Sequence, residues 1–149
     1  MRQPLSTTRF LELQGHRLLQ IGVGLFLFTS FEGFAVEYLK FPRLGLSVHT
    51  LSALCGVMLL TFGLIWEKLK LGSTAARIAF WLLVYSTLAI VAAYFLAAVW
   101  GAGNSTMALA AGAAQGTAVQ ESVIKVVAYS SAPTGIVSFG LILWGLRSD

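Results

Sequence analysis

Long stretches without a charged side chain constrain this sequence more than any other feature. Residues 44–66 run for 23 positions without Asp, Glu, Lys or Arg, and residues 126–146 do so for 21. A helix that crosses the hydrocarbon core of a bilayer needs roughly 20 consecutive apolar residues. Each stretch is therefore predicted to form a membrane-spanning helix.

Two further spans follow from the other uncharged stretches and from the composition. Only 11% of the 149 residues are charged, whereas about 25% of residues are charged in a soluble domain. The 43 uncharged residues of 78–120 are too many for one helix, and the 14 of 18–31 are too few unless a charged end is included. We therefore predict an all-α fold, an integral membrane four-helix bundle in a single domain of residues 1–149. The expected helices span roughly residues 12–36, 45–66, 77–100 and 118–146.

The distribution of Lys and Arg predicts how these helices are oriented. Seven basic residues lie near the termini and the connection between the second and third helices, and three lie on the opposite side. The two groups are Arg2, Arg9, Arg17, Lys68, Lys70, Arg77 and Arg147, against Lys40, Arg43 and Lys125. Since cytoplasmic loops are enriched in Lys and Arg, we expect both termini in the cytoplasm of a multi-pass protein, in a bacterial inner membrane. The scattered charges form no basic patch, which argues against a nucleic-acid partner.

His49 is an ionisable residue that the spans place at membrane depth. Ionisable groups are costly there and mark candidate functional sites. Two interpretations are open, a hydrogen bond to a neighbouring group or axial ligation of a haem iron. Small residues at helical spacings from it, namely Ser52, Ala53, Gly56 and Gly63, would give a flat macrocycle clearance, although the same stripe would let two helices pack closely.

The second histidine, His16, tests the haem interpretation. The first helix begins on the cytoplasmic side and the second begins on the outer side, so His16 and His49 are expected near opposite ends of a core roughly 30 Å thick. One haem cannot use both histidines of a single protomer. The sixth iron position would then be open or weakly filled, which favours catalysis or small-ligand binding over electron transfer.

Charged residues gather at the predicted outer ends of the helices. They are Glu32, Glu37, Lys40, Arg43, Glu121 and Lys125. They are either ordinary interfacial charge or, for Arg43, Lys40 and Lys125, partners of haem propionates, since basic side chains bind carboxylates through charge-assisted hydrogen bonds. The Gly- and Ala-rich residues 101–117 beside them are expected to form a loop, a half-helix or a re-entrant cap, covered by protein or water rather than by lipid.

Two tyrosines and the single cysteine are further polar residues within the spans. Tyr85 and Tyr94 are nine residues apart and point to opposite faces of one helix, so they cannot line one pocket. Cys55 lies six residues beyond His49, on a different face of its helix, where core packing is the expected role of a thiol. A single cysteine excludes an intrachain disulfide.

Several short blocks of the sequence resemble a known enzyme family. They are PRLGLSVH at 42–49, AFWLLVY at 79–85, AAVWGAG at 97–103, AAG at 110–112 with QE at 120–121, and LWGLR at 143–147. Together they resemble the hydroxylaminobenzene mutases, small four-helix membrane isomerases related to styrene oxide isomerase. The similarity extends over most of the chain and includes the histidine that opens the second helix.

The resemblance implies a cofactor, an assembly and a reaction. Styrene oxide isomerase is a trimer of four-helix protomers that binds haem b through the histidine matching His49, and its ferric iron acts as a Lewis acid that converts an epoxide to an aldehyde. The mutase moves a hydroxyl group from the nitrogen of an arylhydroxylamine to the ring, which gives an aminophenol. We therefore expect a homotrimer in which His49 ligates haem b and Arg43 and Lys125 hold its propionates. Tyr85 and Cys55 are the candidate catalytic residues, and the substrate would be an apolar small molecule drawn from the lipid bilayer.

Three positions depart from the pattern of the mutases. Cys55 stands where an Asn is typical, and Leu88 and Ile90 stand where a Tyr and an Asn are typical. The histidine is retained, while groups that would orient a substrate are changed. A non-catalytic haem-binding membrane protein, acting as a sensor or a store, is therefore an alternative, and a small structural subunit without a cofactor is another.

Overall fold

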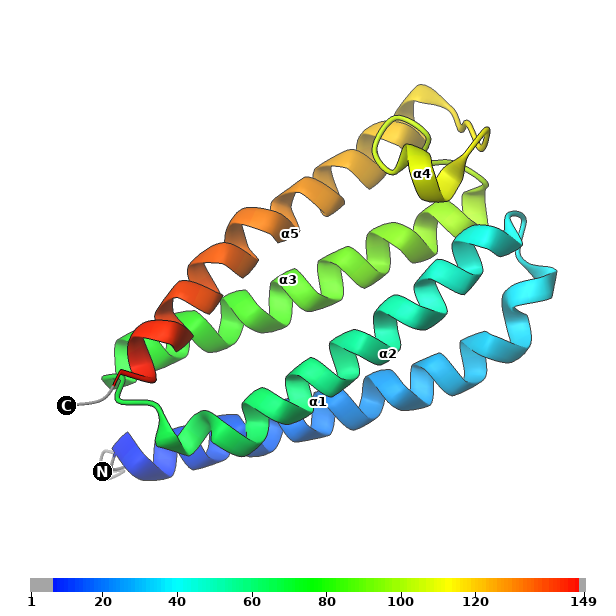
Figure 1. Cartoon of the computed structure of the whole chain (residues 1–149). Helices are drawn as coiled ribbons and strands as arrows, with labels where there is room; N and C mark the ends of the chain where they lie inside the picture. Colours follow the sequence, from blue (N-terminus) through cyan, green and yellow to red (C-terminus); the bar gives the residue numbers. More distant parts are fainter. Residues whose placement is uncertain (1–6, 148–149) are drawn as a thin grey trace, which may run out of the picture.

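The computed structural model describes residues 7–147, which form helices and their connections with no strand in that range (Figure 1). Four long helices carry the fold, α1 (Thr7–Ala35), α2 (Pro42–Ile65), α3 (Ser73–Trp100) and α5 (Ala118–Gly145). The shorter elements are the 3-10 turns η1 (Val36–Tyr38) and η2 (Trp66–Lys68) and the single-turn helix α4 (Ala108–Ala111). Each of the four long helices is long and apolar enough to cross a membrane.

These spans confirm the predicted all-α membrane fold and its multi-pass character. The first three helices begin earlier than predicted, at Thr7, Pro42 and Ser73. An uncharged stretch marks only the part of a helix inside the hydrocarbon, and the backbone hydrogen bonds continue into the polar interface. Pro42 suits the first turn of α2 because its missing N–H is not needed there. The orientation and the kind of membrane remain predictions.

The long helices form two closely packed antiparallel pairs. α1 packs along α2, α3 packs along α5, and the pairs meet where α2 lies beside α3 (Figure 1). The beginning of α1 and the end of α5 lie at one end of the molecule, together with η2. The opposite end holds η1 and α4. We call it the outer end, because the distribution of Lys and Arg predicts that it faces away from the cytoplasm.

Glycines let α1 and α2 approach until their backbones touch. A Cβ atom on Gly15 would lie 2.8 Å from the carbonyl oxygen of Gly63, and one on Gly63 would lie 2.9 Å from that of Gly15. Nearer the middle of the pair, a Cβ on Gly22 would lie 3.0 Å from the carbonyl oxygen of Gly56. Small residues that permit such backbone contact are a common basis of helix association in membranes.

This packing decides between the two interpretations of the small residues that follow His49. Gly56 and Gly63 lie against α1, and Ser52 Oγ is 2.7 Å from Thr29 Oγ1 of α1. For Ser52, Gly56 and Gly63, the interpretation as clearance for a macrocycle was wrong, because α1 occupies that space. These three residues serve helix packing instead.

Buried polar side chains connect the helices at the end that holds the termini. The indole N–H of the fully buried Trp66 donates to Oε1 of Gln14 at 3.1 Å, and the Gln14 amide donates to the carbonyl oxygen of Ala76 at 3.5 Å. These bonds join α1, η2 and the first turn of α3. In the other pair, the Ser138 hydroxyl of α5 donates to the Ala79 carbonyl oxygen of α3 at 2.8 Å. Each polar group thus has the partner that burial requires.

The Glu121 carboxylate organises the segment between α3 and α5. Its Oε1 accepts from the backbone N–H groups of Gly103 at 2.7 Å and Gly116 at 3.0 Å. Its Oε2 accepts from the Ser105 hydroxyl at 2.6 Å and from the Ser105 N–H at 3.2 Å. Of the three forms considered for residues 101–117, the segment adopts a loop that contains the one-turn helix α4.

Candidate functional site

His49 lies near the outer end of α2 with its ring against α1. Its Nδ1 is 3.3 Å from Oε2 of Glu32. On the next residue of α1, Gly33, a Cβ would lie 2.9 Å from Cε1 of the ring and 3.1 Å from Nδ1. The His49 side chain is 40% exposed, whereas that of Glu32 is 2% exposed. The imidazole therefore links a buried carboxylate to an accessible surface.

Glu32 is a functional candidate that sequence analysis did not connect to His49. Within residues 7–147, neither oxygen of its carboxylate accepts an aligned hydrogen bond, and His49 Nδ1 makes none either. A buried carboxylate is costly unless it is paired, and at 3.3 Å the imidazole is its partner. The signal in the sequence was a carboxylate within an apolar helix, but pairing it with His49 required the register of α1 against α2.

The two histidines lie at opposite ends of the α1–α2 pair, which is the separation expected from the sequence. His16 lines a cavity of about 300 Å³ with Glu12 and Glu67, at the end that holds the termini. His49 contacts Glu32 at the outer end. A haem bound by His49 would therefore be out of reach of His16 in the same chain.

The predicted propionate partners contact other parts of the protein. A guanidinium N–H of Arg43 donates to the carbonyl oxygen of Leu109 at 3.0 Å, which ties α2 to α4. The ammonium group of Lys125 lies 5.8 Å from the centre of the Tyr129 ring. Both basic side chains belong to exposed residues at the outer end, and Arg43 has further N–H groups beyond the one used here. Their role toward a cofactor stays a prediction.

Tyr85 and Cys55 line different cavities. The Tyr85 hydroxyl is 2.8 Å from Ser130 Oγ, and its ring lines a cavity of about 480 Å³ together with Leu88. Cys55 is buried and lines a cavity of about 300 Å³ together with Ile90. His49 lines neither cavity. The structure therefore does not bring the two candidate catalytic side chains into one cavity with the predicted iron ligand.

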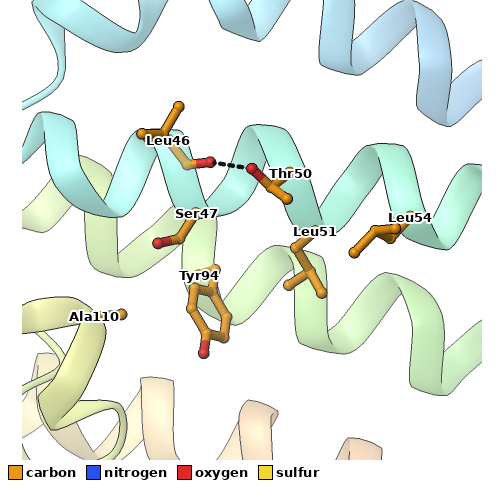
Figure 2. Close-up of a pocket in the computed structure, with 7 residues that line it drawn as sticks. All are labelled: Leu46, Ser47, Thr50, Leu51, Leu54, Tyr94 and Ala110. Carbon is orange, nitrogen blue, oxygen red and sulfur yellow. Dashed lines mark hydrogen bonds between the residues drawn. The ribbon is translucent and has the colours of Figure 1, made fainter.

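A third cavity, of about 430 Å³, lies toward the outer end between α2, α3 and α4 (Figure 2). We call it the Tyr94 pocket, and its lining consists of Leu46, Ser47, Thr50, Leu51, Leu54, Tyr94 and Ala110. The hydroxyls of Ser47 and Thr50 donate to carbonyl oxygens of their own helix. The Tyr94 hydroxyl makes no hydrogen bond within residues 7–147. An apolar cavity of this size with one free hydroxyl group suits an aromatic ligand.

His49 does not point into the Tyr94 pocket of its own chain. At 100° per residue, the α2 side chains of the pocket centre roughly 130° around the helix from His49. These side chains and His49 belong to the same turns of α2, so they lie at a similar depth on different sides. His49 and the pocket therefore face different surroundings of α2.

The residues around His49 fit an axial haem ligand. Within residues 7–147, no group of three or more His, Cys, Asp and Glu side chains could hold a bare metal ion. A haem iron takes its equatorial ligands from the porphyrin and needs only axial ligands from the protein. Since Nδ1 of His49 faces Glu32, Nε2 is the nitrogen left for a ligand. Metal-binding histidines commonly direct their other nitrogen to a carboxylate in this way.

Comparison with known proteins assigns the chain to a family. A family model described as styrene oxide isomerase matches residues 14–147. The chain belongs to the styrene oxide isomerase family. Hydroxylaminobenzene mutase HabB of Ectopseudomonas oleovorans is 45% identical over 132 residues, which cover 89% of this chain and 80% of that protein. Hydroxylaminobenzene mutase HabA of the same organism is 33% identical over 129 residues, or 87% of this chain and 96% of that protein.

Membership of the styrene oxide isomerase family confirms the resemblance found in the sequence blocks and the expectation of an isomerase. No solved structure gives a significant match to this chain. The haem, the homotrimer and the residues assigned to them remain predictions.

Proposed function

We propose that this member of the styrene oxide isomerase family is a haem-b-dependent membrane isomerase that converts an arylhydroxylamine into an aminophenol. The observation that carries the proposal is the 45% identity to a protein named hydroxylaminobenzene mutase over 89% of this chain. In this reaction the N–O bond breaks and a hydroxyl group bonds to a ring carbon. That carbon loses a proton and the nitrogen gains one, so substrate and product contain the same atoms. No external oxidant or reductant is needed.

His49 would hold the haem through Nε2, with Glu32 behind the ring. Haem iron bound there would supply a Lewis acid that polarises the oxygen of the N–O bond. Arg43 and Lys125 lie at the same end of the molecule and would pair with the propionates. The protein's own contribution is then to orient the substrate and to exclude water.

The Tyr94 pocket is the candidate substrate site. Leu46, Leu51 and Leu54 form apolar walls against which an aromatic ring can pack. Leu46 and Leu54 are 60% and 62% exposed within a membrane-spanning helix of the single chain, so an apolar substrate concentrated in the lipid could reach the pocket from the membrane. The free Tyr94 hydroxyl would hydrogen-bond to the hydroxylamine group and orient it.

A homotrimer would complete this site. His49 and the Tyr94 pocket lie on different sides of α2 in one chain. In a ring of identical copies, one face of each protomer meets a different face of its neighbour. Such a ring can set His49 of one protomer opposite the Tyr94 pocket of the next. This geometry is compatible with a closed ring of copies, and the number three comes from the family resemblance alone.

A second candidate function is that of a non-catalytic haem-binding membrane protein, and it is favoured by Cys55, Leu88 and Ile90. These residues line two cavities with weakly polar or apolar groups, at positions where the family resemblance implies an Asn or a Tyr. The two candidates predict the same pigment and differ in turnover. A cofactor-free structural subunit would have neither pigment nor turnover.

One experiment separates these candidates. Wild type, His49→Ala and the control His16→Ala are purified in mild detergent, supplemented with haem b, and assayed with hydroxylaminobenzene and styrene oxide. The proposal expects a Soret band in wild type and His16→Ala that His49→Ala loses, and an aminophenol as product. A pigment without turnover supports the second candidate, and a colourless wild type supports the third. An aldehyde from styrene oxide without any aminophenol would move the assignment to epoxide isomerisation.

A further inference from the structure

Glu32 is a buried carboxylate to which the reaction above assigns no step. The residue is 5% exposed and lies within a membrane-spanning helix. Charged side chains are costly at such a depth and mark functional sites. Nδ1 of His49, at 3.3 Å, is the polar atom that faces it. The function of Glu32 is therefore to be sought at the imidazole.

Neighbouring hydroxyl groups do not satisfy this carboxylate. One turn earlier on α1, the Thr29 hydroxyl donates to the Leu25 carbonyl oxygen at 2.8 Å and lies 2.7 Å from Ser52 Oγ. The Ser52 hydroxyl in turn donates to the Val48 carbonyl oxygen at 2.8 Å. Both hydroxyls are thus used within the α1–α2 contact, and neither donates to Glu32. The imidazole N–H remains as the donor.

We propose that Glu32 is a positioning residue whose carboxylate accepts a hydrogen bond from Nδ1–H of His49 and so keeps Nε2 free to bind a metal. The part that concerns iron rests on the haem-dependent function proposed above. A neutral imidazole carries one N–H and one acceptor nitrogen, so a proton held at Nδ1 leaves the lone pair at Nε2. This hydrogen bond requires a slight rotation of the partly exposed ring, because Nδ1 lies 3.3 Å from the carboxylate without an aligned hydrogen bond.

Gly33 determines where the ring can lie. A methyl group there would come within 2.9 Å of Cε1 and 3.1 Å of Nδ1. The obstacle is a partly exposed ring rather than backbone, so the ring can move aside while the helices stay in place. Gly33→Ala therefore displaces the imidazole from Glu32 and leaves the carboxylate unchanged, which separates the effect of position from that of charge.

The carboxylate also controls how strongly the imidazole donates electrons. A hydrogen bond from Nδ1–H to an anion raises the basicity of the ligating nitrogen. A more basic nitrogen ligand favours ferric over ferrous iron, and a hydrogen bond to the ligating side chain is one of the protein's means of tuning a haem. Removal of the Glu32 charge should therefore shift the midpoint reduction potential of bound haem upward.

The first experiment examines the imidazole without haem. The chain has two histidines, so a His16→Asn background leaves His49 as the single imidazole for ¹⁵N NMR of the apoprotein in detergent. We expect the Nδ1–H tautomer to dominate, and Glu32→Leu to shift the population toward the Nε2–H tautomer. Glu37→Gln removes a carboxylate from an exposed position of η1 and is the matched control. Equal tautomer populations with and without the Glu32 carboxylate would overturn the proposal.

The second experiment examines the haem-bound protein in two variants that alter the contact differently. Glu32→Gln keeps an acceptor oxygen but loses the charge, while Gly33→Ala keeps the charge but moves the ring. Mutation of a group that hydrogen-bonds to a metal-binding histidine typically changes metal affinity about 10- to 100-fold. Both variants should lose haem to apomyoglobin about 10 to 100 times faster than wild type, and Glu32→Gln should raise the midpoint potential. Glu37→Gln should match wild type in both measurements.

The results distinguish this proposal from the proposed function. A wild type with the Nδ1–H tautomer that never binds haem refutes the haem-dependent function and supports Glu32 as the partner of His49. A wild type that binds haem, with unchanged haem loss and potential in Glu32→Gln, overturns the positioning role and leaves the haem site intact. If Glu32→Leu does not fold, Gly33→Ala, which moves the ring away from the carboxylate, provides the comparison in the NMR experiment.

Discussion

The contact between Gly15 and Gly63 should make the α1–α2 pair intolerant of a single methyl group. A Cβ on Gly15 would lie 2.8 Å from the Gly63 carbonyl oxygen and 3.2 Å from Trp66 Cβ. The first distance is about 0.6 Å shorter than the 3.4 Å at which ordinary contact begins. Because the obstacle is backbone, the two helices must move apart before Gly15→Ala can fit.

Two opposing effects set the magnitude. Overpacking a well-packed interior costs about 1–3 kcal/mol, whereas Ala is favoured over Gly inside a helix by about 0.8–1.0 kcal/mol. Gly24 provides a matched control on the same helix, since a Cβ there meets nothing within 4 Å. Gly15→Ala and Gly24→Ala share the helix-propensity gain. The difference between their free energies of unfolding therefore isolates the packing cost, which we expect to be about 1–3 kcal/mol.

The assay is reversible unfolding by SDS in mixed micelles, followed by circular dichroism. Gly24→Ala should be as stable as wild type or slightly more stable, and Gly15→Ala should be less stable. Agreement between the two variants within about 0.5 kcal/mol, the usual range for neutral surface substitutions, would refute the argument that backbone contact limits this packing.

Three further predictions concern single side chains. Glu121→Gln should weaken the loop between α3 and α5, because a hydrogen bond to a charged group contributes about 1.5–3 kcal/mol. We expect faster amide hydrogen exchange at Gly103 in this variant and unchanged exchange in the control Glu37→Gln. Tyr94→Phe should raise KM for the substrate by up to about tenfold, the equivalent of one hydrogen bond, and should leave the haem spectrum unchanged. An unaltered KM would show that the Tyr94 hydroxyl does not contact the substrate. Trp66→Phe should leave the Gln14 amide oxygen without its indole donor and reduce stability by about 1–3 kcal/mol, measured as a lower midpoint of unfolding. An unchanged midpoint would show that the hydrogen bond between Trp66 and Gln14 does not stabilise the fold.

The membrane spans could be predicted from the sequence because their signal is local. Residues 44–66 and 126–146 each satisfy the length requirement of a bilayer without reference to any other part of the chain. The positions of the helix ends were less accurate, since polar turns such as that at Ser73 extend beyond the hydrocarbon. Depth could be predicted in the same way, which is why His16 and His49 were correctly expected at opposite ends.

Contacts between helices could not be predicted, because they depend on rotation and register. The pairing of Glu32 with His49 joins residues 17 positions apart through the geometry of α1 against α2. The small residues after His49 fitted two functions equally well, and only the position of α1 decided between them. Similarly, the sequence assigns Tyr85 and Tyr94 to opposite faces of one helix. It does not show that the Tyr94 hydroxyl lines a cavity, because the other walls of that cavity come from α2 and α4.

The way Glu121 holds its loop bears on how this end of the molecule can evolve. Three main-chain amides donate hydrogen bonds to its carboxylate, those of Gly103, Gly116 and Ser105. The Ser105 hydroxyl is the side-chain donor. Every residue except proline carries such an amide whatever its side chain. Mutations can therefore alter the shape and charge that the loop presents to its surroundings without breaking its anchor. Diversity among descendants should accumulate in the loop residues between these anchor points, because Gly103 has a φ of +107° and a Cβ on Gly116 would lie 2.5 Å from Ala102 Cβ, while the acid that holds the loop stays the same.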